Sequence, residues 1–279
     1  MWRKEFVPLL YRYLDIHPGQ KVVDVGCGTG FMTRLVAKAL KGEGEVLGID
    51  RDSQLLVYAR NAAREDKLSS SISFQKGDAT ALGLPNGFAD RVFCGFMLWS
   101  IPEPKAAVRE MTRVCKPGGL VGAIEGGFDS VAFYYSHDER LSELAMLETK
   151  ALARGYKKLY GLDRGIGNKL PSLFHEVGLE RVRLDAYAYS WLQSDDRIPN
   201  THKVELYRRE LLGMRRPTNR YRASLLKGGM TDDEIDEHDQ LYRKYIKGVV
   251  NGQKAAEDDY SVNAGIFFIT TGVKSRSRA

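Results

Sequence analysis

VVDVGCGTG, residues 22–30 of the 279-residue chain, has the pattern of a short buried strand that runs into a tight turn. Glycines occupy alternate positions 26, 28 and 30, and a helical pattern begins at Phe31. Glycine lets the backbone turn sharply and lets a ligand lie against it at points where any Cβ would intrude. The stretch therefore predicts a strand-to-helix turn that holds a ligand.

The first half of the chain alternates short apolar runs with helical patterns. The helical patterns are residues 31–40, 53–68 and 105–115. The strand-like runs are residues 21–25, 45–49, 72–75, 91–96 and 120–124. Strands joined by crossover helices pair in parallel, and runs without apolar/polar alternation belong to a sheet that is covered on both faces. We therefore predict an α/β fold with a doubly wound, mostly parallel sheet.

The second half is less regular. Thr231 and Glu234 have the spacing of a capping box, which predicts the start of a helix there. Its helical patterns are residues 138–157, 170–177, 203–212 and 231–250, and its strand-like runs are 181–191 and 262–273. We expect one domain with insertions in a common core. The core comprises residues of about 16–125, 165–192 and 262–273, and the helical lid or insertions comprise about 1–15, 128–161 and 200–259.

Composition limits the class of protein. Apolar residues make up 43% of the chain, and no stretch approaches the roughly 18 uninterrupted apolar residues of a membrane span. The start shows no apolar run with a cleavage site, so we expect no secretory signal. Three cysteines without a CxxC pair favour a reducing compartment. The five histidines are scattered without ligand spacing, so we expect no metal site. These features predict a soluble, cytoplasmic protein.

The net charge is +6, from 42 Lys and Arg against 36 Asp and Glu. The arginines gather at positions 208, 209, 215, 216, 220 and 222, and an acidic run follows at 232–239. The two runs largely cancel. They favour mutual pairing or exposed helical faces before an anion site.

Acidic residues follow three of the expected strands. Asp24 lies two positions before Gly26, Asp50 ends the second strand, and Asp78 follows the third. Carboxyl ends of parallel strands share one edge of a sheet, and a strand-end acid there accepts hydrogen bonds from ribose hydroxyls. The GxGxG spacing, followed by Phe31, differs from the GxGxxG of dinucleotide sites. Together these residues indicate one bound nucleoside that carries a cationic amine and no pyrophosphate.

With these motifs, and with the turn CKPGG at residues 115–119, the sequence resembles class I S-adenosylmethionine-dependent methyltransferases of the ubiquinone/menaquinone-biosynthesis type. The resemblance covers about residues 14–125. It implies a Rossmann-like methyltransferase fold with a seven-stranded sheet, and S-adenosyl-L-methionine as the cofactor.

The resemblance also implies roles for individual residues. Asp24 and the glycine turn hold the methionine end of the cofactor, Asp50 binds the ribose, and Arg51 lies beside the adenine. The implied cofactor-binding set is Asp24, Gly26, Cys27, Gly28, Thr29, Gly30, Asp50, Arg51, Gly77, Asp78, Ala79, Phe96 and Leu98.

The groups that would bind and activate a methyl acceptor are less evident. The loop at residues 98–102 offers no base, and Trp99 either forms a wall of the acceptor pocket or packs in the core. The segment after the fifth strand supplies Glu125, Tyr134, Tyr135 and His137. Tyr134 and Tyr135 can equally anchor a helix, and His137 can equally begin one. The catalytic candidates are His137, Tyr134, Tyr135 and Trp99.

We expect methyl transfer to a small-molecule acceptor. A nucleic-acid methyltransferase lacks support because no Asp/Asn-Pro-Pro-aromatic loop or Pro-Cys nucleophile occurs, and a protein-arginine enzyme would need two glutamates where only Glu103 lies nearby. A non-catalytic S-adenosylmethionine-binding protein stays open because the loop base is missing. A nicotinamide dehydrogenase is disfavoured because Phe31 breaks the glycine spacing.

Overall fold

The computed structural model describes residues 6–127, 132–136, 138–192, 194–195, 199–214, 219–252 and 260–276. The chain divides into two compact units, which we describe separately. The first unit is Met1–Gly126, Ile166–Tyr187 and Phe267–Ala279, and the second is Gly127–Gly165 and Ala188–Ile266.

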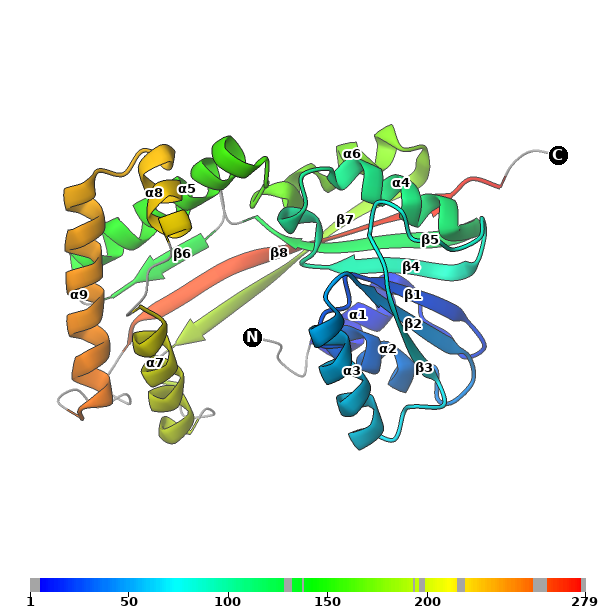
Figure 1. The fold of residues 1–279 in the computed structure, drawn as a ribbon, viewed down its shortest axis with the longest axis horizontal. Helices are drawn as coiled ribbons and strands as arrows, with labels where there is room; N and C mark the ends of the chain where they lie inside the picture. The colour runs from blue at the N-terminus through cyan, green and yellow to red at the C-terminus, as the bar shows by residue number, and fades with distance from the viewer. Residues whose placement is uncertain are drawn as a thin grey trace. The chain divides into compact units, whose positions relative to one another are not determined.

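The first unit is built on a largely parallel sheet with strand order β3-β2-β1-β4-β5-β8 (Figure 1). These strands are β1 (Lys21–Val25), β2 (Glu45–Asp50), β3 (Ile72–Lys76), β4 (Ala89–Gly95), β5 (Cys115–Gly126) and β8 (Val262–Lys274). Strands β1 to β5 pair in parallel, and β8 runs antiparallel to β5. Strand β7 (Leu179–Leu192) pairs with β8. The order reverses between β1 and β4, so the predicted doubly wound sheet is confirmed.

Helices cover both faces of this sheet (Figure 1). On one face lie α1 (Phe6–Leu14), α2 (Phe31–Ala39) and α3 (Ser53–Glu65), and on the other lie α4 (Pro104–Val114) and α6 (Leu170–Glu176). Two short 3-10 helices are η1 (Leu98–Ser100) and η2 (Ile166–Lys169). The central strands β1, β4 and β5 bury most of their residues, whereas β3 and β7 carry several exposed ones. Val23, Val92 and Phe174 belong to a core with no solvent exposure. Coverage on both faces explains why the strands read as continuous apolar runs.

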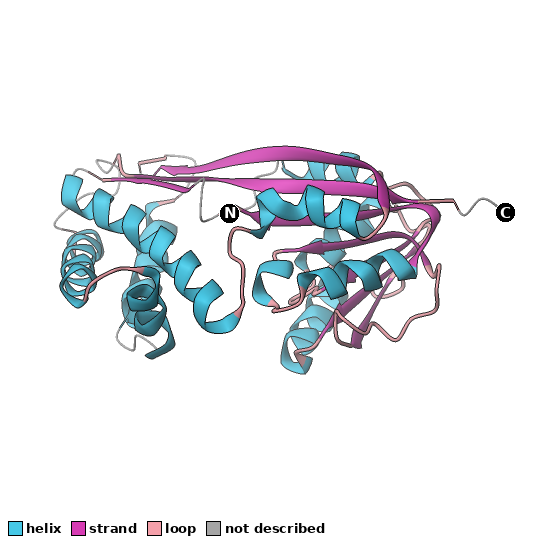
Figure 2. Ribbon diagram, turned by 90° about the horizontal axis from the view of Figure 1, so that it is seen from above, coloured by secondary structure: helices cyan, strands magenta, loops and turns pink. Residues whose placement is uncertain are grey.

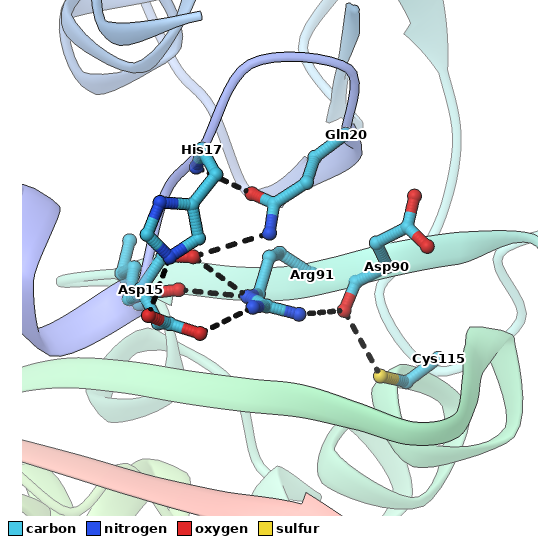
Figure 3. Close-up of polar contacts among 7 residues, drawn as sticks. Asp15, His17, Gln20, Asp90, Arg91 and Cys115 are labelled. Atoms are coloured by element: carbon cyan, nitrogen blue, oxygen red, sulfur yellow. Dashed lines mark hydrogen bonds and ion pairs between the residues drawn. The ribbon is translucent and has the colours of Figure 1, made fainter.

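Arg91 in β4 ties the end of α1 to the sheet (Figure 3). Its Nε donates to the main-chain oxygens of Leu14 and Asp15, at 3.0 and 3.1 Å, and its Nη2 donates to Asp15 Oδ2 at 2.5 Å. Nη1 donates to the main-chain oxygen of Asp90 at 3.0 Å. These contacts lie at the amino end of β4, so they fix α1 without occupying the edge where the strands end.

Residues 188–192 of β7 and 262–266 of β8 belong to the second unit, whose described part adds one short strand and four helices. They are β6 (Ala132–Tyr135), α5 (Glu139–Tyr160), α7 (Asn200–Met214), α8 (Asn219–Gly228) and α9 (Asp232–Val250). Helices α5 and α8 touch backbone to backbone, because a Cβ added at Gly155 would overlap the main chain of Ser224, and one at Gly228 would overlap that of Ala151. The capping box of Thr231 and Glu234 starts α9 and is confirmed.

The arginines of this unit are largely paired with acids. Arg222 forms ion pairs with Asp232 and Asp236, and both Arg208 and Arg209 bond to Glu205. The guanidinium of Arg220 lies over the ring of Tyr160, 4.1 Å from its centroid. Residues 215 and 216 lie outside the described part of the chain. Pairing between the basic and the acidic run therefore holds for Arg222, whereas Arg208 and Arg209 pair with an acid of their own helix.

The sheet has eight strands where the resemblance implied seven. The additional strand, β6, falls in the range 128–161 that the sequence analysis assigned to helix. Its four residues pair antiparallel with Val262–Gly265 of β8, a contact between distant parts of the sequence that gives no local pattern. Strands β7 and β8, with 14 and 13 residues, are the longest described, and they appear among the long magenta ribbons of Figure 2.

Candidate active site

The glycine turn has the backbone that its sequence predicts. Gly26, Gly28 and Gly30 have φ values of 72°, 53° and 71°, which side chains other than glycine adopt with strain. A Cβ at Gly26 would overlap the side chain of Met97, and one at Gly30 would lie 2.9 Å from the ring of Phe74. A Cβ at Gly28 would meet nothing within 4 Å. Both the positive φ and the close packing require glycine at positions 26 and 30. At position 28 only the φ does so, because Gly28 borders open space.

A cavity of about 490 Å³ lies where the parallel strands end. It is lined by residues at or after the carboxyl ends of four strands: Val25 and Gly26 (β1), Ile49, Asp50, Arg51, Asp52 and Leu55 (β2), Gly77, Asp78, Ala79 and Thr80 (β3), and Phe96, Met97, Ser100, Ile101, Pro102 and Glu103 (β4). This volume suits a ligand of nucleoside size. The cavity occupies the topological switch point, where ligands of open α/β sheets bind.

Asp50 is held rigidly at the cavity wall. Its Oδ2 accepts the N–H of Gly28 at 2.8 Å, and its Oδ1 accepts the N–H of Asp52 at 2.9 Å. A carboxylate accepts about four hydrogen bonds, so each oxygen keeps acceptor capacity. The side chain is therefore fixed between the glycine turn and α3 and can still accept two hydroxyl groups.

Asp78 also faces the cavity with one oxygen engaged. Its Oδ1 accepts both the N–H and the hydroxyl of Thr80, each at 2.7 Å, which is the geometry of an Asx turn. These two bonds, with a smaller contribution from the charge of Arg51, hold the pKa of Asp78 below its ordinary value. Among the described residues we find no donor to Oδ2. Asp78 therefore offers an acceptor beside Ala79, whose side chain also lines the cavity.

Asp24 lies beneath the turn and does not line the cavity. Its side chain is 2% exposed, and its Oδ2 accepts the hydroxyl of Thr33 at 2.6 Å. Burial raises the pKa of Asp24 to about 7, the Thr33 bond opposes this, and the nearby charge of Asp50 adds to it. If Asp24 acts on the methionine end of the cofactor, as the resemblance implies, it acts from beneath the glycine turn, where it does not line the cavity.

The other residues of the cofactor set fall into three groups: some line the cavity, some are buried, and one is exposed. Gly77 and Phe96 line the cavity, and Phe96 has a φ of 55°, which is uncommon for a residue with a side chain. Cys27 and Leu98 are buried, with the Cys27 thiol close to Gly48. Thr29 is exposed at the turn. Of the predicted set, the residues that do not line the cavity are Asp24, Cys27, Gly28, Thr29, Gly30 and Leu98.

The acceptor-side candidates lie in different parts of the fold, and Trp99, in the first unit, does not line the cavity. Trp99 packs against the first unit's core cluster, in keeping with a packing role. Tyr134 and Tyr135 lie on β6 in the second unit, where Tyr135 is 54% exposed. His137 lies outside the described residues. Glu125 is fully buried in the first unit, so it does not present a carboxylate to solvent.

Part of the cavity wall was not predicted from the sequence. Met97, Ser100, Ile101, Pro102 and Glu103 line the cavity but carry no recognisable motif. The loop takes its place through tertiary contacts, such as that between Met97 and Gly26. The glycine at position 26 was the only hint in the sequence, because a glycine at a turn allows another group, here the side chain of Met97, to lie directly against the backbone.

The charge of the cavity lining is negative. Asp50, Asp52, Asp78 and Glu103 contribute four carboxyl groups, against the single guanidinium that Arg51 contributes to this lining. A lining of this sign attracts a cation and repels a pyrophosphate. The cavity thus suits a nucleoside with a positive charge better than a dinucleotide.

Comparisons with known proteins agree with this geometry. Residues 23–122 match the family model described as a methyltransferase domain. Over 194 residues the chain is 29% identical to the demethylmenaquinone methyltransferases of Bacillus cereus and Bacillus anthracis, an alignment that covers 67% of this chain and 80% of each relative. The chain carries an S-adenosylmethionine-dependent methyltransferase domain. The implied family and cofactor are therefore confirmed.

Several solved structures are similar to this chain in fold. The YcgJ protein from Bacillus subtilis matches with a TM-score of 0.58 and 16% identity, covering 98% of this chain and 99% of that one. Phosphoethanolamine N-methyltransferase 2 from Haemonchus contortus, in complex with S-adenosyl-L-methionine, matches at 0.52 and 15%, covering 97% and 52%. The [4+2]-cyclase SpnF matches at 0.55 and 21%, covering 97% and 80%. At these identities the likeness concerns the fold alone.

No group of three or more histidine, cysteine, aspartate or glutamate side chains in the described part of the chain could hold a metal ion. None of the described helices combines the length and the apolar character needed to cross a bilayer.

Proposed function

We propose that the methyltransferase domain binds S-adenosylmethionine in the cavity at the strand ends and transfers its methyl group to a small-molecule acceptor. The observation that carries this proposal is the open space at Gly28 beside the fixed carboxylate of Asp50. An adenosyl group needs a cradle without a Cβ, with an acceptor for its ribose, and these two residues supply both.

The residues present fit the cofactor. We assign the ribose hydroxyls to Asp50 and the adenine edge to Asp78 and Ala79, with Arg51 at the exposed rim. The glycine turn, with Asp24 buried beneath it, serves the methionine end, and the carboxyl groups of the cavity lining complement an ammonium and a sulfonium. The bound cofactor supplies a methyl group already activated on a sulfonium.

The chain's own residues then have two tasks: to align the acceptor with the methyl group and to exclude water. The apolar residues Val25, Ile49, Met97 and Ile101 are part of the cavity lining and favour the second task. Transfer by in-line displacement needs no protein base when the acceptor is already nucleophilic. We therefore assign no catalytic base to the described loops.

The small-molecule acceptor is proposed from the relatives, whose names specify demethylmenaquinone. We further propose a cytoplasmic location. Cys27, Cys94 and Cys115 are all buried and free, which suits a reducing compartment.

Thermal unfolding with candidate ligands tests the cofactor proposal. A ligand at about 100 times its Kd adds about 2.7 kcal/mol to the free energy of unfolding, so S-adenosylmethionine and S-adenosylhomocysteine should raise the melting temperature clearly. NAD should leave it unchanged. A shift with NAD, and none with either adenosyl ligand, would overturn the assignment of the cavity.

The acceptor class is tested with S-adenosylmethionine labelled in its methyl group. Incubation with demethylmenaquinone and a mixture of small phenols and amines should place label in the small-molecule fraction. Parallel reactions contain total RNA or total protein. Label found solely in RNA or in protein would refute the small-molecule acceptor while leaving the cofactor site intact.

A further inference from the structure

Glu125, near the end of β5, is a fully buried acid in the first unit. Its Oε1 accepts the main-chain N–H groups of Met97 and Leu98, at 2.9 and 2.6 Å. These groups stand at the start of η1, whose N-cap residue Met97 makes no side-chain capping bond. The carboxylate of Glu125 therefore caps η1 from a neighbouring strand.

The preceding residue of β5 extends this hold. The main-chain oxygen of Ile124 accepts the N–H of Phe96 at 2.8 Å, so Ile124 and Glu125 together fix three successive N–H groups of the loop after β4. Phe96 is the residue with a φ of 55°. A strained conformation persists where its surroundings fix it, and such residues gather at functional sites.

The loop fixed in this way forms one wall of the cofactor cavity. Phe96, Met97, Ser100, Ile101, Pro102 and Glu103 all line it. Glu125 itself is absent from the lining. Any effect of Glu125 on a ligand must therefore pass through the loop.

The electrostatics show that Glu125 is costly to bury. Burial raises the pKa of its carboxyl to about 8, against the opposing effect of the N–H groups of Leu98, Met97 and Trp99. Its second oxygen, Oε2, is buried and has no hydrogen-bond partner among the described residues. A buried acid with a half-satisfied carboxyl adds little net stability, because an apolar side chain of similar volume would serve packing as well.

We propose that Glu125 is a positioning residue for methyl transfer: its Oε1 holds the loop after β4 in the conformation that closes the cofactor cavity. This inference rests on the proposed function, since it assigns a task at the same site. The protein loses cofactor affinity when this bond is lost, even while the first unit stays folded.

Three substitutions test the role, read by calorimetric titration with S-adenosylhomocysteine. Glu125→Met removes the acceptor at similar volume, and Glu125→Asp keeps the carboxyl group but falls one methylene short. Each should weaken binding about 10-fold or more, since a loosened wall misplaces ligand contacts. Glu125→Gln keeps an amide oxygen at the Oε1 position and should bind within about 3-fold of the unchanged protein.

Glu110 provides the matched control. Its Oε2 accepts the N–H of Leu82 at 3.0 Å, so Glu110 also fixes a loop by a carboxylate-to-backbone bond, but the residue it holds, Leu82, does not line the cavity, whereas Met97 does. Glu110→Met should lower the urea midpoint and leave the affinity for S-adenosylhomocysteine unchanged. A purely structural role for Glu125 would give this same result at position 125.

The outcomes separate the two proposals. If the unchanged protein binds S-adenosylhomocysteine and both Glu125→Met and Glu125→Asp bind equally well, the positioning role is refuted and the proposed function stands. If Glu125→Met does not fold, the Asp and Gln variants decide, and equal affinity in these two refutes the role. If the unchanged protein does not bind, both proposals fall.

Discussion

Gly28 is the residue at which the account is easiest to test. Its φ of 53° strains any side chain, but a Cβ there meets nothing within 4 Å. Gly28→Ala should therefore cost stability only through the backbone, about 1–2 kcal/mol, because the left-handed conformation is unfavourable for alanine. The added methyl group should occupy ligand space and weaken S-adenosylhomocysteine binding about 100-fold or more in calorimetry.

Gly19 is the control for that substitution. Its φ is 83°, and a Cβ there also meets nothing within 4 Å, but Gly19 lies in the turn before β1, whereas Gly28 lies in the turn that follows β1 and donates its N–H to Asp50. Gly19→Ala should show a similar loss of stability and unchanged affinity. Equal affinity of the two variants would mean that the ligand does not lie against Gly28.

Asp24 should make stability depend on pH. Its pKa is about 7 in the folded protein, against an ordinary value of 3.8. Between these values the folded protein keeps a proton that the unfolded chain has lost, so the free energy of unfolding falls as pH rises from about 4 to 7. Asp24→Asn removes this effect, and its stability relative to the unchanged protein should rise over that interval by at most about 4 kcal/mol.

Urea denaturation at several pH values measures this difference, with Asp66→Asn as a control of opposite sign. The bond from Lys38 is the main reason that the pKa of Asp66 is lowered, so Asp66 contributes stability that is lost as pH falls. Asp66→Asn should lose stability relative to the unchanged protein as pH rises. A pH-independent effect of Asp24→Asn would show that Asp24 is ionised throughout.

At the scale of elements, the contact between α5 and α8 depends on two glycines. A Cβ at Gly155 would overlap the main chain of Ser224. Gly155→Ala should push the helices apart and lower the free energy of unfolding by about 1–3 kcal/mol, as overpacking does. Urea denaturation followed by circular dichroism measures the loss.

Gly248 in α9 is the matched helical glycine, because a Cβ there meets nothing within 4 Å. Gly248→Ala should stabilise the protein by about 0.5–1 kcal/mol, since alanine favours the helix over glycine. If Gly155→Ala also stabilised the protein, the close packing of α5 on α8 would be wrong.

Elements were predictable from the sequence where local patterns and burial agree. β1 matches its predicted bounds of 21–25, and β2 and β3 each extend one residue beyond theirs, because buried parallel strands read as apolar runs between glycines and helices. Helix α8 was missed because charges dominate its sequence and its packing on α5 fixes it. The role of residues 1–15, 128–161 and 200–259 as lid insertions stays a prediction.

The candidate site was predictable to a similar extent. Asp50, Asp78 and Ala79 meet at one cavity because parallel strands end at a shared edge. The loop at 97–103 was not predictable, since its place depends on Glu125 and Ile124 in a different strand. The sequence named Glu125 as an acceptor-side group, but its burial and its bonds to Met97 and Leu98 point to a different task.

At the scale of the whole molecule, the fold alone leaves the reaction open. The same architecture occurs in a [4+2]-cyclase and in a phosphoethanolamine N-methyltransferase. Function on such a fold resides in the site. Here the family match over residues 23–122 and the acidic cavity together specify the cofactor, and the acceptor is left to experiment.

A crystal structure of the protein with S-adenosylhomocysteine tests the central claim most directly. We predict that the adenosyl group lies in the cavity against Gly28, with the ribose hydroxyls within about 3.2 Å of the Asp50 carboxylate and the adenine beside Asp78 and Ala79. Electron density for the ligand at any other site, with this cavity filled by solvent, would contradict the account.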